Sequence, residues 1–405
     1  MTVFYILDGF PCVSENFILR EILALKKSGL NLRICALRKS EMETVHKDAL
    51  PLVEEVIYVE DIPILSKILA VAYNIYRHPA YCLSLFFHLF SDIFISFRFF
   101  CQRLRGAVNA MAVAKIAGTG PDHVHAHFAY VTSDMAKVLA GISGCRWSVS
   151  VHAWDIFTQP GNIISRRIEG ADKVFVCSRH GKELLENLPC MCKEKIVLQY
   201  HGVSTGEFEA SSEGQYIIAV GRLEEKKGFD ILLQACRILA DGKTCPRFII
   251  VGEGPRRGLL EAKIKELGLE NVELPGAMSF NKVKEMMSGA MMLVHPGRTT
   301  KNGDHDGIPN VILEAMALGK PVITSSVGGI SEVIEDKVNG LIVRTEDQVQ
   351  LAEAIRSVMN DKSLAEKLGN VAREHVRKNF ELSETLKPMF EYFNEMKTDD
   401  RRQEL

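Results

Sequence analysis

Residues 216–235 read YIIAVGRLEEKKGFDILLQA and contain one complete strand, loop and helix. Tyr216 to Val220 is a short apolar run, which predicts a buried strand. Phe229 to Leu239 has the apolar spacing of a helix, and a basic loop joins the two segments. A strand followed by a helix is the repeating unit of a parallel sheet. We therefore expect an α/β protein.

The same alternation extends in both directions along the chain. In the first half, we expect strands at 3–7, 32–37, 55–59, 123–128, 147–151, 173–177 and 196–200, with helices such as 15–27 and 132–139 between them. In the second half, we expect strands at 216–220, 247–251, 291–294, 321–325 and 340–343. Such strands form parallel sheets that bind ligands at their carboxyl ends.

A polar segment, 204–214, separates the two halves. We expect two βαβ domains, residues 1–205 and 206–381, followed by a C-terminal segment, 382–405. In that segment, 382–396 is amphipathic and predicts a helix, whereas the charged end, 397–405, is expected to fray. A cleft between the domains is the expected site of chemistry.

The composition and net charge of the chain exclude some classes of function. The chain has 405 residues, of which 47% are hydrophobic, which is enough for two cores. Its formal net charge of -2 gives no global positive field, so nucleic acid is not expected as a partner. The ten cysteines form no Cys-x-x-Cys pair, and Cys190 and Cys192 lack the second pair that zinc would need. Free thiols and a strand-like start at Met1 to Leu7 favour the cytoplasm.

One segment, 62–105, departs from this average. Between Ile62 and Pro121, six basic residues accompany a single acid, Asp92. His88, Asp92 and Arg98 interrupt its apolar middle, so we do not expect it to span a membrane. At helical spacing, one face would carry Leu83, Phe87, Phe90, Phe94 and Phe97. That face suits a helix lying on a membrane surface or, as an open alternative, a domain core.

Two cations follow the strand that ends at Val220. Arg222 and Lys227 would project from the carboxyl edge of the sheet, next to the start of a helix. Cations at such a helix start favour a phosphate or a diphosphate. The alternative is a solvated loop with no specific ligand.

A second motif, DHDGIPNVILEAMALGKP, occupies residues 304–321. Its proline start and its Gly-Lys-Pro end predict a short helix, whose first N–H groups lack intrahelical partners and can face an anion. Glu314 would repel that anion, so a pair of hydroxyl groups is its more suitable partner. Asp306 precedes the helix and can hold further hydroxyls. Together the motif suits a nucleotide sugar, although such a helix is also often merely well capped.

The spacing from Asp306 to Glu314 resembles the acid-x7-Glu motif of the retaining GT-B glycosyltransferases of family 4, and 221–228 resembles their phosphate-binding segment. Segments 251–255, 328–332 and 339–343 are similar to that family in the same order, so the resemblance covers essentially the whole chain. Segments 10–18, 125–129 and 151–155 resemble its colanic acid and amylovoran branch. The resemblance implies the GT-B fold: two Rossmann-like domains facing across a cleft, with a C-terminal helix returning to the first.

The resemblance also implies roles for individual residues. Arg222 and Lys227 would bind the donor diphosphate, Glu314 the ribose, Asp306 the transferred sugar, and His152 would lie beside that sugar. The stretch of Gly307, Ile308, Pro309 and Asn310 would contribute backbone groups to the donor site. On the acceptor side the expected residues are Ser14, Glu15, His125 and His127. No metal or cofactor is implied, and a UDP-sugar is favoured over a GDP-sugar as donor.

Three features qualify these expectations. His123, His125 and His127 alternate along one strand and so share a face, as in a metal site, but the nearby sequence offers no clear carboxylate and we expect no metal there. Asp306 stands where the family usually has Glu. His201-Gly202-Val203-Ser204 stands where Asn-Gly-Val-Asp is frequent.

The resulting hypothesis is a retaining hexosyltransferase. It would move a sugar to a lipid-linked glycan at the cytoplasmic face of a membrane, in exopolysaccharide, capsule or lipopolysaccharide biosynthesis. One alternative is a soluble GT-B enzyme, either an epimerase of sugar nucleotides or a transferase with a small acceptor. Another is a non-catalytic partner that binds sugar nucleotides.

Overall fold

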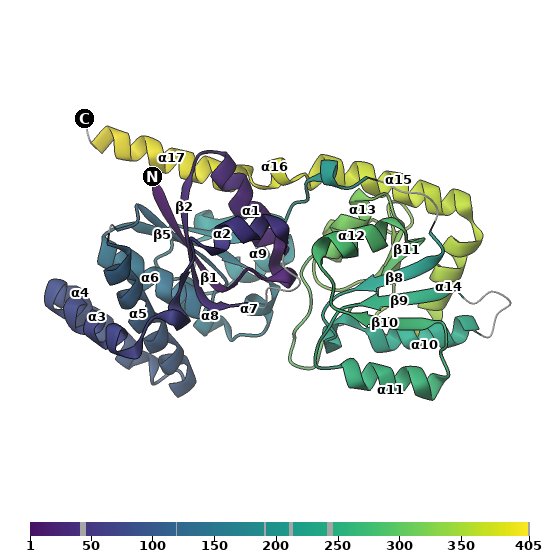
Figure 1. Ribbon diagram of the computed structural model, residues 1–405, viewed down its shortest axis with the longest axis horizontal. Coiled ribbons are helices and arrows are strands. Elements are labelled where there is room, and N and C mark those ends of the chain that lie inside the picture. The colour runs from purple at the N-terminus through teal and green to yellow at the C-terminus, as the bar shows by residue number, and fades with distance from the viewer. Residues whose placement is uncertain (41–45, 119, 190–191, 210–213, 241–245, 404–405) are drawn as a thin grey trace.

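The computed structural model describes residues 1–40, 46–118, 120–189, 192–209, 214–240 and 246–403, so Cys190 lies outside the described residues (Figure 1). Two parallel sheets lie side by side, one from each half of the chain, and helices flank both (Figure 1). The α/β prediction and the two-sheet architecture are confirmed.

The first sheet has seven strands in the order β3-β2-β1-β4-β5-β6-β7. Its strands are β1 (Thr2–Phe10), β2 (Asn31–Lys39), β3 (Ile57–Tyr58), β4 (His123–His127), β5 (Arg146–Val151), β6 (Lys173–Val176) and β7 (Ile196–Leu198). The accompanying helices are α1 (Asn16–Lys27), α2 (Leu50–Val53), α3 (Ile64–Arg77), α4 (Pro79–Asp92), α5 (Phe97–Ala117), α6 (Val131–Ser143), α7 (Ala153–Phe157), α8 (Gly161–Ile168) and α9 (Arg179–Glu186).

The second sheet has six strands in the order β10-β9-β8-β11-β12-β13. Its strands are β8 (Tyr216–Val220), β9 (Arg247–Val251), β10 (Val272–Gly276), β11 (Met292–His295), β12 (Val322–Ser325) and β13 (Leu341–Val343). The helices are α10 (Phe229–Ala240), α11 (Arg257–Leu267), α12 (Phe280–Ser288), α13 (Asn310–Ala317), α14 (Gln348–Asn360) and α15 (Lys362–Asn379). We call the unit around the first sheet the first domain and the unit around the second sheet the second domain.

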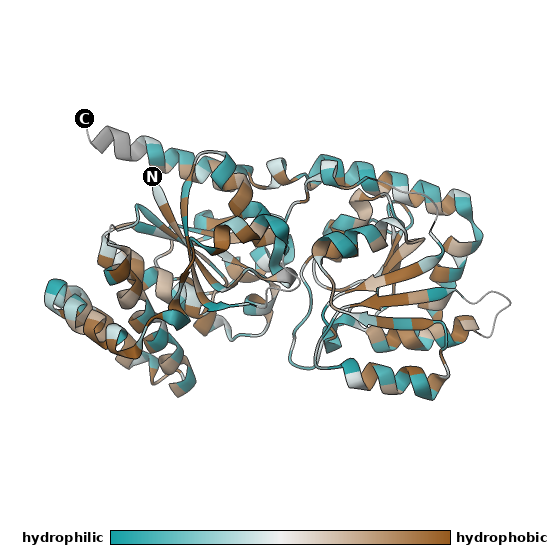
Figure 2. Ribbon diagram, in the orientation of Figure 1, coloured by the Kyte–Doolittle hydropathy of each residue, from teal (hydrophilic) through white to brown (hydrophobic). Residues whose placement is uncertain are grey.

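Buried strands form the centre of each domain, because both faces of a parallel sheet are covered by helices. Figure 2 shows the strands of both sheets as hydrophobic, with hydrophilic residues on the outward faces of the helices. In β1, residues Val3 to Leu7 are at most 1% exposed. The apolar runs along the sequence are therefore strands buried on both faces.

The chain returns to the first domain after α15, as the resemblance implied. Val203 exchanges backbone hydrogen bonds with Phe380 and Leu382 beside the crossing point, at 2.9 and 3.0 Å. Helices α16 (Leu382–Thr385) and α17 (Lys387–Gln403) follow, and α17 lies along the first domain (Figure 1). Met389 and Phe393 are fully buried there, in one cluster with the side chains of β1.

The structure corrects three expectations. Strand β10 was not predicted, because Val272–Gly276 contains Pro275; proline is tolerated there since β10 is an edge strand. Helix α17 extends as far as Gln403, well beyond the predicted helix limit at Met396. The segment 81–100 is not one helix: α4 ends at Asp92, and α5 begins after Ser96, whose side chain accepts from the Phe99 N–H group at 3.5 Å.

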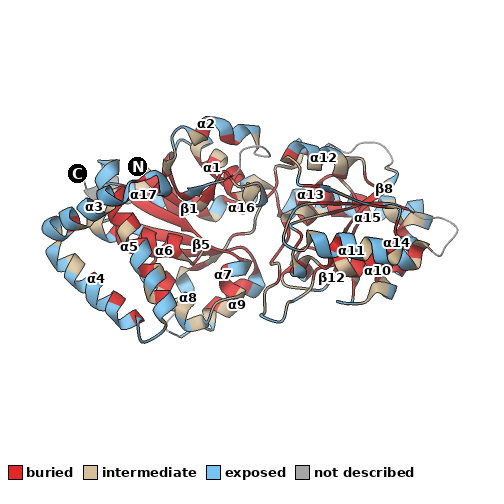
Figure 3. Cartoon of the chain, turned by 60° about the horizontal axis from the view of Figure 1, so that its bottom comes forward, coloured by how far each residue is buried: buried red, intermediate tan, exposed pale blue. Residues whose placement is uncertain are grey.

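Helices α3 and α4 lie at the outer edge of the first domain and are largely exposed (Figure 3). Asp92 attaches α4 from its end: its buried carboxylate contacts Arg103 of α5 at 2.6 Å and Arg166 of α8 at 3.1 Å. Opposite this attachment, the rings of Phe87 and Phe94 are 62% and 82% exposed. The alternative that these rings form a domain core is wrong.

Candidate active site

Loops at the carboxyl ends of the two sheets meet between the domains. The Glu332 carboxylate, after β12, accepts from the Tyr200 hydroxyl at 2.8 Å and from the Arg179 backbone N–H at 2.7 Å. The Phe157 ring stacks on His305 of the second domain with 4.0 Å between the ring centroids. The two domains are thus in direct contact around the predicted site.

The basic loop after β8 is held in place by a glycine. Residues Glu225–Lys227 form a single 3-10 turn, which Gly228 ends with a φ of 65°. A side chain at Gly228 would place its Cβ 1.8 Å from the carbonyl oxygen of Pro296, so only glycine fits. The loop is therefore pressed against the segment that follows β11, which also carries Asp306.

Lys227 and Asp306 come together at this contact. The Lys227 Nζ atom donates to Asp306 Oδ2 at 2.6 Å, and Lys226 and His295 lie 3.8 and 3.4 Å from the same carboxylate. Burial alone would raise the pKa of Asp306, but the charge of Lys227 and the bond with His295 hold it well below its usual range. The structure thus joins two of the predicted catalytic residues, Lys227 and Asp306, in one partly buried cluster. Arg222 is separate from it, half exposed, with Glu224 at 3.1 Å.

Glu314 lies on α13 and contacts the other domain. Its Oε1 atom accepts from Arg20 Nη2 of α1 at 2.8 Å, and both side chains are at least nine-tenths buried. Burial raises the pKa of Glu314, and the charge of Arg20 opposes that rise. Arg20 Nη1 is buried with no hydrogen-bond partner among the described atoms, and the guanidinium lies 5.0 Å from the centroid of the Phe280 ring.

The start of α13 lies against the first domain. Pro309 is its N-cap residue and Asn310 its first helical residue, one position later than the sequence suggested. Gly307 and Ile308 are buried, and a Cβ atom built on Gly307 would lie 3.4 Å from the Cβ of Ala153. Asn310 Oδ1 lies 3.1 Å from Nδ1 of His201. The segment 307–310 therefore meets the residues that follow β5 and β7.

His152 is placed by its own helix. It is the N-cap of α7, and its backbone N–H donates to Asp155 Oδ1 at 2.7 Å, while the backbone N–H of Ala129 donates to Asp155 Oδ2 at 2.5 Å. Asp155 thus ties the end of β5 to the end of β4. The buried imidazole of His152 has a pKa well below its usual range, because of burial and of the neighbouring His201 and His127. His152 is therefore neutral.

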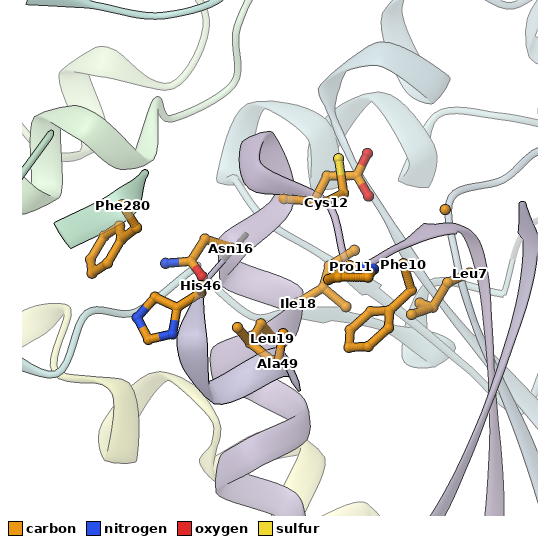
Figure 4. Close-up of a pocket in the computed structure, with 12 residues that line it drawn as sticks. Leu7, Phe10, Pro11, Cys12, Asn16, Ile18, Leu19, His46, Ala49 and Phe280 are labelled. Atoms are coloured by element: carbon orange, nitrogen blue, oxygen red, sulfur yellow. The ribbon is translucent and has the colours of Figure 1, made fainter. Parts of the chain in front are cut away.

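A small pocket lies beside α1, on the first-domain side of the cleft (Figure 4). Its lining is mainly apolar, and it consists of Leu7, Gly9, Phe10, Pro11, Cys12, Glu15, Asn16, Ile18, Leu19, His46, Ala49 and Phe280. The Phe280 ring of the second domain closes it, with its centroid 5.1 Å from that of His46. Burial and the charge of Asp8 raise the pKa of Glu15 to about 7. Ser14 is exposed and is not part of the lining.

His125 and His127 lie beneath the cleft on β4 and are fully buried. His125 bonds through both ring nitrogens to Ser148 and Ser150, at 2.8 and 3.1 Å. The sequence near these histidines offers no clear carboxylate, but Glu21 of α1, 106 positions earlier than His127, lies 2.9 Å from it in the structure. Glu21, His125 and His127 are close enough to hold a metal ion. In the structure their ligand atoms are instead joined by hydrogen bonds to protein groups.

Sequence reasoning missed four residues of this site, namely Arg20, Glu21, Asp155 and His295. Arg20 and Glu21 lie in a helix whose apolar spacing gives no sign that its polar residues point inward. Asp155 three positions after His152 is a capping-box spacing that would have identified it. His295 ends β11, directly opposite Asp306, and its position at a strand end is the only available signal.

The comparisons with known proteins agree with this geometry. Residues 206–375 match the family described as Glycosyl transferases group 1. WcaL of Escherichia coli (strain K12), named as a colanic acid biosynthesis glycosyltransferase, is 29% identical over 94% of this chain and 96% of its own. AmsK of Erwinia amylovora, an amylovoran biosynthesis glycosyltransferase, is 34% identical over 39% of this chain and 40% of its own.

Among solved structures, HepE of Anabaena in complex with UDP-glucose superimposes with a TM-score of 0.75 at 16% identity, covering 98% of this chain and 100% of that one. This likeness shows the fold. The two parallel sheets are those of a GT-B protein, and the residues predicted to bind the donor, Arg222, Lys227, Asp306 and Glu314, lie in the part of the chain that the family matches. The chain therefore carries a Glycosyl transferases group 1 domain over residues 206–375, and its two domains together have the GT-B fold.

Proposed function

We propose that this glycosyltransferase moves a hexose from a nucleoside diphosphate sugar to a lipid-linked glycan, with retention of configuration. It would act at the cytoplasmic face of a membrane, in exopolysaccharide, capsule or lipopolysaccharide biosynthesis. The contact between Lys227 Nζ and Asp306 Oδ2, 2.6 Å long at the start of α13, carries the donor part of the proposal. It puts a cation for phosphate, an acid for sugar hydroxyls and free helix N–H groups in one place.

The charges suit departure of a nucleoside diphosphate. Negative charge grows on the phosphate oxygen as its bond to the anomeric carbon breaks, and Lys227, Arg222 and the start of α13 stabilise that charge. The acceptor hydroxyl forms the new bond on the same face of the sugar, and its proton passes to the leaving phosphate oxygen. Because these cations come from the chain itself, the reaction as proposed requires no metal or cofactor.

The donor assignment can be narrowed. Glu314 would accept hydrogen bonds from ribose hydroxyls and Asp306 from the sugar, while the neutral His152 would lie beside the sugar from the opposite domain. HepE, which has the same fold, was crystallised with UDP-glucose. This supports a UDP-sugar over a GDP-sugar. Thermal shift with a panel of both kinds tests the assignment, since a ligand that binds only the folded state raises Tm.

The acceptor would approach through the pocket beside α1. Glu15 lies in its lining and Ser14 next to it, and the apolar walls would contact the faces of sugar rings. His125 and His127 support this side of the cleft from below. Relatives whose names refer to colanic acid and amylovoran favour a growing exopolysaccharide repeat as the acceptor.

The exposed face of α3 and α4, together with the turn that follows and the first residue of α5, supports a membrane-bound acceptor. We define this apolar face as Ile64, Leu65, Ile68, Leu69, Tyr76, Leu83, Phe86, Phe87, Phe90, Phe94 and Phe97. The exposed cations Arg77, Arg98 and Arg105 accompany it. Apolar side chains with nearby cations are typical of surfaces that lie on anionic lipid. No helix among the described residues is long and apolar enough to cross a bilayer.

A transferase that acts on a small soluble acceptor is the second candidate, because the donor site would be the same. Flotation with anionic vesicles separates the two. Co-flotation supports the lipid-linked acceptor, and recovery of the protein only in the aqueous fraction supports the soluble one.

A further inference from the structure

A continuous row of hydrogen-bonded side chains runs from the core of the first domain to the second domain. We call it the histidine row, and it consists of Glu21, His127, His152, His201 and Asn310. Glu21 Oε1 lies 2.9 Å from His127 Nε2, and His127 Nδ1 lies 3.1 Å from His152 Nε2. His152 Nδ1 lies 3.2 Å from His201 Nε2, and His201 Nδ1 lies 3.1 Å from the Asn310 amide. Every ring nitrogen of the three histidines is thus used once.

Glu21 sets the direction of the hydrogen bonds along the histidine row. Its two carboxylate oxygens already accept from the Tyr5 hydroxyl at 3.0 Å and from the Gln199 amide at 3.2 Å. A carboxylate only accepts hydrogen bonds, so the third neighbour, His127 Nε2, must carry the proton. The proposal requires a neutral His127, whose other ring nitrogen, Nδ1, is then an acceptor.

The same reasoning applies to the next residues of the histidine row. His127 Nδ1 accepts, so His152 donates to it from Nε2–H and keeps Nδ1 as an acceptor. His201 then donates its Nε2–H to His152 Nδ1. Asn310 Oδ1 faces His201 Nδ1 in the structure, at 3.1 Å, so this direction requires the Asn310 amide to turn over and present its NH2 group to that nitrogen. Burial lowers the pKa of His152 far below its usual value and that of His201 to about 3, so both rings remain neutral. The hydrogen bonds of the histidine row require this neutral state.

We propose that Glu21 and His127 are positioning residues that fix His152 as the Nε2–H tautomer, with Nδ1 as a hydrogen-bond acceptor facing the second domain. His152 would therefore take a hydrogen bond from a hydroxyl of the donor sugar and would not give one. In the structure His201 occupies that acceptor nitrogen, so the sugar hydroxyl would replace the Nε2–H of His201. The inference rests on the proposed function, which places His152 beside the donor sugar.

Aromatic rings pack against the histidine row. The Phe17 ring stacks on His201, with 3.8 Å between centroids and 15° between planes, and the Phe128 ring lies 4.6 Å from His152. His127 is fully buried. His127 and His152 are both buried, so the tautomer of each ring depends on its neighbour in the histidine row.

The test is ¹⁵N NMR of the full chain labelled at histidine, which reports which nitrogen of His152 carries the proton. In the wild type we expect Nε2–H. Glu21→Gln introduces an NH2 group that can donate to His127, so the Nδ1–H form of His152 should appear and kcat/KM should fall roughly 10- to 100-fold. His201→Asn should leave the His152 tautomer unchanged, because Glu21 sets it from the other end.

His123→Gln is the matched control. His123 is equally buried on the same face of β4, but it bonds to Ser148, which is not part of the histidine row, at 2.8 Å. We expect its tautomer pattern at His152 and its kcat/KM to match the wild type. Nδ1–H in the wild type, which can be measured even if no variant folds, would overturn the inference, and so would an unchanged His152 tautomer in folded Glu21→Gln. If the wild type transfers sugar to no acceptor, the proposed function is contradicted. The NMR measurement of the His152 tautomer would still be valid in that case.

Discussion

Arg20 of the first domain and Glu314 of the second form an ion pair across the cleft, with Nη2 and Oε1 separated by 2.8 Å and both side chains almost wholly buried. Glu314 is the acid proposed to bind the donor ribose. In the structure its Oε1 is occupied by a residue 294 positions earlier in the chain. Under this proposal, donor binding competes with the Arg20–Glu314 pair, and occupation of the donor site is linked to the contact between domains.

Removing one partner of this pair should be costly. Glu314→Leu leaves the Arg20 guanidinium buried without its counter-charge, and we expect it to lower the free energy of unfolding by about 3 kcal/mol. The double variant Arg20→Met/Glu314→Leu should recover much of that loss, because neither charge is then buried. Urea unfolding of the wild type, both single variants and the double variant measures the coupling.

The exposed pair Arg247–Glu273, at 2.6 Å, is the control for this cycle. Its coupling should be below about 1 kcal/mol, since water screens both groups. Additive effects at Arg20 and Glu314 would show that their contact does not contribute to the stability of the closed arrangement.

Lys227 should matter more for turnover than for folding. Lys227→Ala or Arg222→Ala removes a cation from the departing diphosphate, and we expect turnover to fall by roughly 10² to 10³. Arg247→Ala, which removes an exposed cation at the amino end of β9 in the same sheet, should leave turnover unchanged. Steady-state rates of nucleoside diphosphate release measure all three. Near-wild-type rates in both Lys227→Ala and Arg222→Ala would remove the diphosphate assignment.

Glu15 makes stability depend on pH. Burial and Asp8 raise its pKa from 4.5 to about 7, against the opposing charges of Arg222 and Arg38. Between these values the folded state binds more protons than the unfolded state, so the contribution of Glu15 to stability falls as pH rises. Glu15→Gln cannot ionise. We therefore expect the variant to gain stability relative to the wild type from pH 4.5 to pH 7, and to gain little more above it.

Denaturant unfolding at several pH values measures this difference. The comparison isolates Glu15 because Asp134 and Asp155, whose pKa values burial raises to about 6 and about 7, are present in both proteins. A difference in stability that stays constant over this range would contradict the raised pKa of Glu15.

The apolar face should bind anionic membranes. Phe87→Ser/Phe94→Ser removes two exposed rings, and each ring would bury surface worth roughly 2 kcal/mol. We expect the binding to vesicles of phosphatidylglycerol and phosphatidylcholine to weaken at least about tenfold. Leu259→Ser/Val371→Ser, at exposed positions of the second domain, is the control. Equal flotation of both double variants and the wild type would exclude this face as the membrane contact.

The sequence predicted the strands well, because strands buried on both faces appear as uninterrupted apolar runs. Tyr216–Val220 and Arg247–Val251 have the expected limits. Strand β10 was missed because Pro275 breaks that pattern, and an edge position is known only once the sheet is assembled. For the apolar face, the spacing of the rings is the same whether helix α4 packs inside or outside, so only the structure decides between core and surface.

The candidate site was predictable in part. Lys227, Asp306 and Glu314 follow strands of one parallel sheet, whose carboxyl ends meet at one edge. Arg20 and Glu21 gave no such signal, because their partners depend on how the two domains close. His201 was noticed only as a departure from the family pattern, and its contact with His152 depends on two separate strand ends.

The most direct test of the central claim is an incubation of the purified protein with UDP- and GDP-sugars and a polyprenyl-diphosphate glycan, followed by mass spectrometry of the lipid fraction. We predict that one hexose is added to the lipid-linked glycan from a UDP-sugar, with release of one UDP. Folded protein that transfers no sugar from any donor in the panel to the lipid-linked acceptor would contradict the account.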